Sequence, residues 1–542
     1  MELYTRRQNY YRQLNIITVG GLGMSAVKWF LFALLVLILL LFTSNNNLSL
    51  ATYPPEVRTV GIFELRFYSG SKDDKNYVQY TDSYSDRPFT TEMINESVKY
   101  VGYWEQLVNT SKVTGDYKIV VNFTYDSSVK TALGGGSNIV NIINNGAKPN
   151  ATQTDAMISI GGRFDRETII HEFGHVLGFS VNEMAPYLVD IYGEKYTDTN
   201  TVAITGAGTI NDGIFNLYED AGDANFKYPV FLGRRDGAIE ELIGSVHNWD
   251  GSLDTSKLDI LAQAAIQGTS TNPQTGEFAV DLSHTGNMHS LMSYGAFINM
   301  PFMPEIELAM LEELGYSINR RKAFGHSYYK RSDDKYDGLV IGLDGYNSDF
   351  IFGVGAHVFM DGLNLLQTAD ISSGGEEGAG IRVDGSNNTI SVDKFTNVEA
   401  SGKNGVGLMV AWGSNNVLIN RGIIAATGEG GIAVELNVKG GDAHSYYTNT
   451  GNGEARDDAE HYRATQDLKD ALVNRFDISG EIIGKEYAIF INSTAHVKEI
   501  NIMNGAKIYG NIVSNYNGIT NLTFGKLAAD DNGEATNSAD LS

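Results

Sequence analysis

The segment His171-Glu172-Phe173-Gly174-His175 has residue types and a spacing that suit a metal site. On a helix, positions i and i+4 lie on one face, so the imidazoles of His171 and His175 can both reach one ion. Neutral imidazole is a good zinc ligand, and a catalytic zinc keeps one coordination position open for water. Glu172 lies beside the two histidines and is suitably placed to take a proton from that water. The segment therefore predicts a catalytic Zn²⁺ site.

A catalytic zinc needs a third protein ligand in addition to these two histidines. The chain contains no cysteine, so this ligand must be a His, Asp or Glu side chain. Two histidines, His284 and His289, lie together about 110 residues downstream in the segment 283–295. The remaining histidines are scattered without partners at ligand spacing and are interpreted as structural or surface residues. No Ser-His-Asp array, phosphate loop or calcium-binding nonapeptide repeat stands out.

The helix segment resembles that of the metzincin zinc metalloproteases. Their helix reads H-E-x-x-H-x-x-G-x-x-H and is followed later by a turn that contains a methionine, the Met-turn. This chain matches the pattern from His171 to Gly178, but Val181 stands where the third histidine belongs. The glycine suits a helix that must end there and turn the chain away. The resemblance therefore implies that the third ligand comes from elsewhere in the chain.

The segment Leu291-Met292-Ser293-Tyr294 resembles the Met-turn. His284 stands eight positions before Met292, which is similar to the spacing in metzincins, and the resemblance implies that it is the third zinc ligand. His289 is the alternative ligand, only three residues before Met292. Residues 182–280 then correspond to an insertion like the one that delays the third histidine in leishmanolysin-like members.

The resemblance also implies roles for the other site residues. Glu172 is the general base that activates water for attack on a peptide carbonyl, Met292 supports the site as an apolar residue, and Tyr294 stabilises the oxyanion. A gluzincin alternative instead takes its third ligand from a downstream glutamate, Glu194. This alternative leaves Met292 and Gly178 without an explanation.

The elements around the motif favour an α+β catalytic domain. Residues 60–67 and 117–123 alternate like strands, and residues 96–109 have apolar side chains at helical spacing. A short strand at 157–160, interpreted as the edge strand, ends at a Gly-Gly pair. Asp165 is a suitable N-cap for the helix that carries the two histidines. The order strand, helix, strand, edge strand, metal-binding helix is expected of a zincin domain.

The texture of the sequence changes after this domain. An amphipathic helix is expected at 305–314, closed by Gly315, and from about Gly338 short β runs alternate with Gly and Asn. Residues 378–388 recur at 405–416, which is 27 to 28 positions later, and a weaker copy begins at 430. Such repeats predict an all-β solenoid, most simply a parallel β-helix. Residues 454–475 look like a charged, helical excursion from it.

The solenoid resembles the passenger of Gram-negative autotransporters, in which a β-helix stalk carries catalytic insertions. At the other end of the chain, a basic segment precedes the apolar run 29–42, and small residues follow at 49–51. Fourteen apolar residues are short for a membrane span and suit a secretory signal peptide, while an uncleaved N-terminal anchor is the alternative. The expected boundaries are 1–51 for the signal peptide or anchor, 52–325 for the metzincin-like domain and 326–542 for the solenoid.

Composition bounds the partners of this 542-residue chain. The net charge of −25 argues against binding to nucleic acid. Together these features favour an exported zinc metalloendopeptidase that acts on a protein or peptide substrate. Its N-terminal segment engages the membrane or the export machinery, and the protein is secreted or held at the surface of a Gram-negative-type bacterium. The alternative from another class is a surface adhesin or interaction protein with a degenerate protease domain.

Overall fold

A computed structural model describes the two halves of the chain, an N-terminal part (residues 55–325) and a solenoid (residues 326–526). The described residues are 55–68, 88–111, 113, 118–125, 132–136, 139, 142–143, 155–161, 164–179, 203–205, 237–245, 264–267, 277–285, 290–292, 302–329, 338–438 and 470–526. The expected signal peptide or anchor at 1–51 lies outside them. No helix within these ranges is long and apolar enough to cross a membrane.

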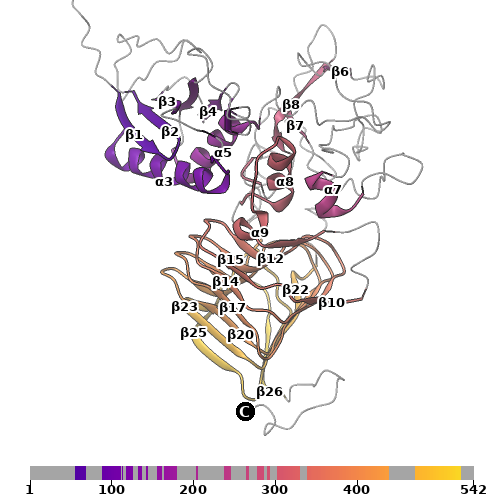
Figure 1. Ribbon diagram of the computed structural model, residues 1–542. Coiled ribbons are helices and arrows are strands. Elements are labelled where there is room, and N and C mark those ends of the chain that lie inside the picture. The colour runs from indigo at the N-terminus through magenta and orange to yellow at the C-terminus, as the bar shows by residue number, and fades with distance from the viewer. Residues whose placement is uncertain are drawn as a thin grey trace, which may run out of the picture.

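The N-terminal part is built on a five-stranded mixed sheet with helices on one face (Figure 1). In spatial order the strands are β1 (Glu56–Val60), β2 (Phe63–Phe67), β3 (Ile119–Tyr125), β5 (Asp155–Ile160) and β4 (Ala132–Gly135). The three central strands are parallel, and the two outer strands run antiparallel to their neighbours. Helices α3 (Thr91–Leu107) and α5 (Arg166–Leu177) pack on this sheet through aromatic and aliphatic side chains that are almost completely buried.

Two expectations about this sheet are wrong. Residues 60–67 do not form one strand, because Gly61 takes a positive φ of 53° and turns the chain into a hairpin between β1 and β2. The strand at 157–160 is not at the edge, since β5 lies between β3 and β4. The edge strand is instead β4, whose Leu-Gly-Gly sequence has little β propensity of its own.

Downstream of α5, short elements join the sheet to the solenoid. The predicted helix at 305–314 is confirmed as α8 (Glu305–Glu313), and Gly315 follows it with a positive φ of 104°. Helices α7 (Ala238–Ile243) and α9 (Arg320–Ala323) lie beside it. The segment 182–280, expected to be irregular, contains α7 together with β6 (Ala203–Thr205), β7 (Ala264–Gln267) and the first four residues of β8 (Glu277–Thr285). These three strands form a small antiparallel sheet in the order β6-β8-β7.

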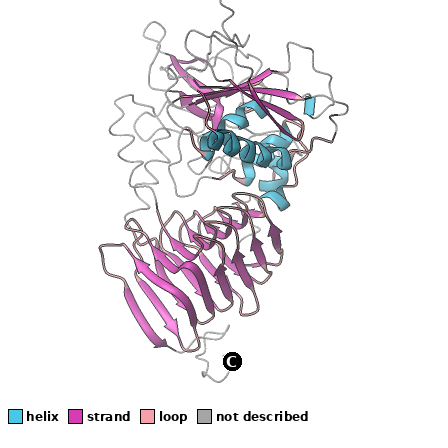
Figure 2. Cartoon of the chain, turned by 90° about the vertical axis from the view of Figure 1, so that its left-hand side faces the viewer, coloured by secondary structure: helices cyan, strands magenta, loops and turns pink. Residues whose placement is uncertain are grey.

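The C-terminal half is an all-β solenoid of parallel strands, as the repeats predict (Figure 2). One sheet contains β10 (Leu339–Gly342), β13 (Asn364–Gln367), β16 (Thr389–Val392), β19 (Asn416–Asn420), β22 (Val473–Ile478), β24 (Glu499–Met503) and β26 (Asn521–Lys526). The other, curled sheet contains β9 (His326–Tyr328), β11 (Tyr346–Ser348), β12 (Val354–Val358), β14 (Ile371–Ser373), β15 (Ala379–Val383), β17 (Asn397–Ala400), β18 (Val406–Val410), β20 (Ile423–Ala426), β21 (Ile432–Leu436), β23 (Glu481–Ile491) and β25 (Lys507–Ser514).

The sequence repeats correspond to stacked coils of the solenoid. Ala379 of β15 pairs with Val406 of β18, and Val406 pairs with Ile432 of β21, so the three copies lie in register. Aliphatic side chains fill the interior. At a buried corner, the side-chain oxygen of Asn416 accepts from the backbone N–H of Asn388 at 3.0 Å, and Asn388 accepts in the same way from Leu363 at 2.7 Å. The predicted helical excursion at 454–475 is wrong at its end, because β22 begins at Val473; its first sixteen residues, 454–469, lie outside the described residues.

The two halves share one hydrophobic core. Phe352, Val354 and Ala379 of the first coils pack in the same cluster as the buried residues of α3, α5 and α8. Two ion pairs flank this contact: Lys99 of α3 with Glu376, and Arg166 of α5 with Glu377. Both views show the helices between the five-stranded sheet and the solenoid (Figures 1 and 2). The helices of the N-terminal part and the first coils of the solenoid therefore belong to one continuous core.

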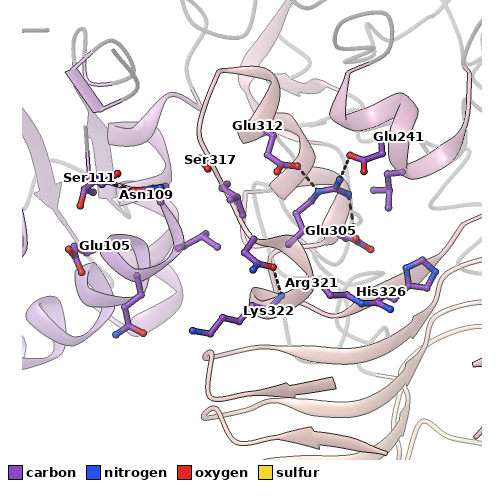
Figure 3. Close-up of a pocket in the computed structure, with 18 residues that line it drawn as sticks. Glu105, Asn109, Ser111, Glu241, Glu305, Glu312, Ser317, Arg321, Lys322 and His326 are labelled. Carbon is purple, nitrogen blue, oxygen red and sulfur yellow. Dashed lines mark hydrogen bonds and ion pairs between the residues drawn. The ribbon is translucent and has the colours of Figure 1, made fainter. Parts of the chain in front are cut away.

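A polar pocket of about 980 Å³ lies beside this junction (Figure 3). Its walls come from the end of α3, from α7, α8 and α9, and from His326 at the start of β9. Arg320 of α9 lies in one wall and pairs with three carboxylates, those of Glu241 at 2.9 Å, Glu305 at 3.4 Å and Glu312 at 2.5 Å. These pairs join the three helices, and of the predicted site residues whose side chains are described, His171, Glu172, His175 and Met292, none lines the pocket.

Candidate metal centre

Helix α5 carries the proposed metal ligands, and its ends are those expected from the sequence. The side chain of Asp165 accepts a hydrogen bond from the backbone N–H of Thr168 at 2.9 Å, so Asp165 is the N-cap. Gly178 ends the helix with a positive φ of 123° and donates its N–H to carbonyl groups of the last turn. Glycine adopts this backbone conformation without steric cost, and the chain turns away at this point.

Three contacts from other elements fix α5 in place. Trp104 of α3 donates its indole N–H to the carbonyl oxygen of Ile170 at 3.0 Å, and both groups are buried. Phe63 of β2 packs edge-on against Phe173, with 5.0 Å between the ring centroids. Near the end of the helix, the hydroxyl of Tyr316 donates to the carbonyl oxygen of Leu177 at 2.6 Å. The helix that holds the histidines is therefore restrained along its whole length.

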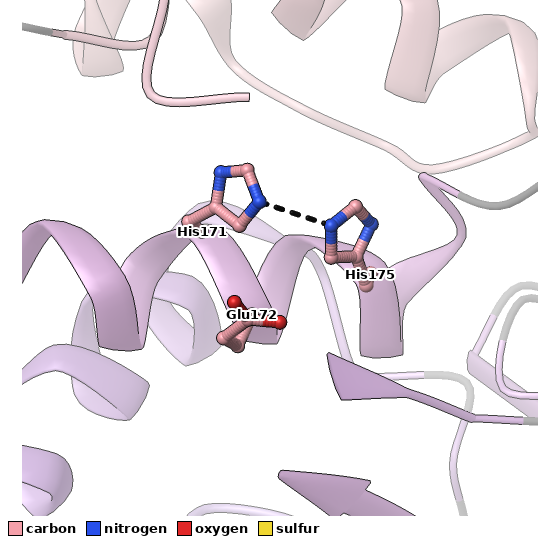
Figure 4. Close-up of side chains that lie close together, drawn as sticks. All are labelled: His171, Glu172 and His175. Atoms are coloured by element: carbon pink, nitrogen blue, oxygen red, sulfur yellow. Dashed lines mark hydrogen bonds between the residues drawn. The ribbon is translucent and has the colours of Figure 1, made fainter. Parts of the chain in front are cut away.

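His171, Glu172 and His175 form a cluster that could hold a metal ion (Figure 4). The two Nε2 atoms are 3.1 Å apart. The Nδ1 atom of His171 lies 2.5 Å from the carbonyl oxygen of Leu291, and the Nδ1 atom of His175 lies 2.6 Å from that of Phe179. A carbonyl oxygen can only accept, so each neutral ring carries its proton on Nδ1 and presents an unprotonated Nε2.

This donor set fits a zinc ion. Two nitrogen ligands at about 2.0–2.1 Å from a tetrahedral zinc lie about 3.3 Å apart, close to the separation of the two Nε2 atoms. Two acceptor nitrogens at such a distance repel each other unless a cation or a shared proton lies between them. The carbonyl partners of Nδ1 fix the tautomer and the orientation of each ring, as the outer contacts of metal-bound histidines do.

Glu172 is held in an apolar environment beside the histidines. Glu172 is 6% exposed, and this burial raises the pKa of its carboxyl group to about 8. A hydrogen bond from the backbone N–H of Gly134 acts in the opposite direction and lowers this pKa. Gly134 belongs to the edge strand β4, and a Cβ at this position would overlap the carbonyl group of Glu172. The edge strand therefore approaches α5 closely because it carries glycine at this point.

Met292 lies directly against helix α5. It is completely buried, and a Cβ added to Gly174, between the two histidines, would overlap its sulfur atom. The turn is braced from α8, where the carboxylate of Glu307 accepts from the hydroxyl of Ser290, which in turn accepts from the backbone N–H of Met292 at 2.8 Å. The carbonyl group that orients His171 belongs to Leu291 in the same turn.

The remaining predicted site residues are less fully described. His284 lies near the end of β8, and only its backbone is described. His289, Tyr294 and the gluzincin candidate Glu194 lie outside the described residues. The structure thus brings His171, Glu172, His175 and Met292 together, and the third ligand stays a prediction.

A Ser-His-Asp array, which the sequence did not suggest, lies at the start of the solenoid. The Nδ1 atom of His357 lies 3.1 Å from the hydroxyl of Ser327, and its Nε2 atom lies 2.9 Å from the carboxylate of Asp384. All three residues are at most 5% exposed, so no substrate reaches the hydroxyl and the array is structural. Burial lowers the pKa of His357, so the ring is neutral and donates from Nε2 to Asp384. Its three residues lie on neighbouring coils. Their spacing in the sequence, about one coil apart, is the signal that could have identified the array.

Comparison of the chain with models of protein families, with curated proteins and with solved structures finds no match.

Proposed function

We propose that this protein is a zinc-dependent endopeptidase with a metzincin-like site on α5. The observation that carries the proposal is the pair of histidines whose Nδ1 atoms both face carbonyl oxygens and whose Nε2 atoms lie 3.1 Å apart. Met292 packed under Gly174 supports the same assignment, because the methionine lies at the level of the two ligands. His284 is the proposed third ligand, with His289 as the alternative.

The residues of the site divide the chemistry among them. His171 and His175 hold the metal, which when bound supplies Lewis acidity towards water and a carbonyl oxygen. Glu172 accepts a proton from the attacking water as the new C–O bond forms. It returns this proton to the amine as the peptide C–N bond breaks. Its burial excludes bulk water, so the proton stays with the reacting groups.

The edge strand β4 favours a peptide substrate. Strand β4 pairs with β5 on one side, and no described strand pairs with its other side. Gly134 of β4 contacts Glu172. An extended peptide that pairs with the outer edge of β4 receives backbone hydrogen bonds and passes beside the carboxylate. Leu133, which is 59% exposed, is available to pack against such a peptide.

Export completes the proposal. The basic segment and the apolar run 29–42 direct the rest of the chain across the membrane, either as a signal peptide or as an anchor. The absence of cysteine means that no disulfide has to form afterwards. The solenoid then presents the protease at the cell surface or in the medium.

The test uses Glu172→Gln with Glu167→Gln, on the first turn of the same helix, as the matched control. We expect wild type and both variants to bind one equivalent of zinc, and only Glu172→Gln to lose hydrolysis of casein or a quenched peptide library, by a factor of about 100 or more. His284→Ala is expected to lose zinc and His289→Ala to keep it, and the reverse result moves the ligand to His289.

An intact protein that binds no zinc would contradict the proposal and favour a surface-interaction role. Undiminished hydrolysis by Glu172→Gln would contradict the role assigned to Glu172.

A further inference from the structure

Phe302 lies where the Met292 turn meets the solenoid. Its residue is 2% exposed, and its backbone pairs with Ser290 at the start of the turn. The carbonyl oxygen of Phe302 accepts a hydrogen bond from the backbone N–H of Leu291 at 3.0 Å. The carbonyl group of the same Leu291 faces Nδ1 of His171. A displacement of Phe302 therefore moves the group that orients a proposed metal ligand.

The ring of Phe302 is held by residues of the solenoid. The guanidinium of Arg382, on β15, lies over the ring at 4.1 Å from its centroid. His357, on β12, packs against the same ring edge-on at 5.3 Å. A guanidinium over an aromatic face is attracted by the ring, more strongly where water is excluded, and Arg382 is 2% exposed.

Arg382 is itself fixed by a charged network. Its Nε donates to the carboxylate of Asp384 at 2.7 Å and Nη2 donates to the other oxygen at 3.3 Å. His357 approaches the same carboxylate at 2.9 Å, and His357 and Arg382 pair in register on neighbouring coils. The register of the coils therefore determines the position of the Arg382 guanidinium, and the guanidinium in turn holds the ring of Phe302.

We propose that Arg382 is a positioning residue for the metal centre and that it acts through Phe302 and Leu291 on His171. The first coils of the solenoid then help to position a ligand of the metal centre. This inference rests on the proposed function, since it assigns the centre a metal, and it adds a role for a residue more than 200 positions away in the sequence.

The experiment measures zinc affinity by competition with a chelating indicator, on full-length protein without substrate. Outer contacts of metal-bound histidines change affinity by about 10- to 100-fold when mutated, and Arg382 is two contacts further away, so we expect Arg382→Met to weaken zinc binding by about 3- to 10-fold. Phe302→Leu is expected to weaken it by a similar factor. Arg382→Lys keeps the charge near the ring and is expected to retain part of the affinity.

A double-mutant cycle separates coupling from general damage. Arg382→Met combined with Phe302→Leu is expected to lose little more affinity than either single variant, because both break the same connection. Arg475→Met, at an exposed arginine of β22, and Leu408→Ala, in the solenoid interior, are the controls. Both are expected to keep the zinc affinity of wild type, although Leu408→Ala lowers stability.

Three outcomes would overturn the inference. They are unchanged zinc affinity in folded Arg382→Met and Phe302→Leu, fully additive losses in the double variant, and an equal loss in Leu408→Ala. If Arg382→Met does not fold, Phe302→Leu compared with Leu408→Ala decides alone. Wild-type protein that binds zinc but cleaves no peptide refutes the proposed function and leaves this inference open to the same measurement.

Discussion

Gly174→Ala tests the packing of the turn at Met292 against helix α5, which carries the proposed metal ligands. In the wild-type background an added Cβ overlaps the sulfur of Met292, which is completely buried, with Phe179 also in contact at 3.6 Å. Overpacking of this kind costs about 1–3 kcal/mol, whereas alanine gains about 1 kcal/mol over glycine inside a helix. We therefore expect a net loss of up to about 2 kcal/mol in the free energy of unfolding.

The sign should reverse when the methionine is truncated. Met292→Ala alone leaves a cavity and is expected to cost about 2–5 kcal/mol. In that background the Cβ at position 174 enters the cavity, so Gly174→Ala should stabilise the protein by up to about 1 kcal/mol. Gly102→Ala, on α3, is the control, because a Cβ there meets only Val60 at 3.9 Å and the substitution should stabilise the helix.

Hydrogen exchange of the α5 amides measures these effects locally, without assuming that a chain of 542 residues unfolds in one step. The same variants are assayed for zinc affinity, which Gly174→Ala should lower by displacing Leu291 from His171. A change of the same sign and size for Gly174→Ala in both backgrounds would refute the packing of Met292 against Gly174.

Three further predictions concern the edge strand, the metal and a buried carboxyl group. Gly134→Ala pushes β4 away from α5 and should reduce peptide hydrolysis about tenfold or more with zinc retained, whereas Gly135→Ala, whose Cβ meets nothing within 4 Å, should leave it unchanged. Zinc at 100 times its dissociation constant should add about 2.7 kcal/mol of stability, lost on chelation and absent in His171→Ala, as judged by thermal unfolding. Burial raises the pKa of Glu305 from 4.5 to about 7 against the opposing charge of Arg320, so the carboxyl takes up a proton on folding between these pH values. Its burial therefore costs increasingly more as pH rises from about 4.5 to 7, by about 3 kcal/mol in total, and urea unfolding of Glu305→Gln should lack this decline. A decline of equal size in Glu305→Gln would assign it to other groups.

The parts that the sequence predicted correctly are those with a local or periodic signal. Asp165 and Gly178 mark the ends of α5 because capping and a positive φ depend on the residue at that position. The solenoid was recognisable because equivalent residues recur once per coil, as in the pairing of Ala379 with Val406 and Ile432. The proximity of His171 and His175 follows from helix geometry alone.

The parts that were missed depend on contacts between distant segments. The edge strand β4 has no strand pattern of its own, and it is defined by its pairing with β5 and by the fit of Gly134 against Glu172. The link from Arg382 through Phe302 to Leu291 joins residues about 90 positions apart, and no local pattern marks it. The proposed third ligand is difficult to identify for the same reason, because about 100 residues without clear periodicity separate the candidates His284 and His289 from α5.

The parallel stacking of coils also fixes the length of the solenoid by the number of its coils. The sheet that runs from β10 to β26 has its strands in chain order, and neighbouring strands lie about 4.8 Å apart, so its seven strands span about 29 Å. From β10 to β21 each coil adds 25 to 28 residues, and each coil moves the chain one strand spacing further from the α5 helix. Removing residues 406–431 would join equivalent positions of neighbouring coils, so that the inward-facing side chains still face inward. The solenoid would become shorter by one coil, which is about 4.8 Å. A deletion of half that length would join positions that are not equivalent and so break the register between neighbouring coils.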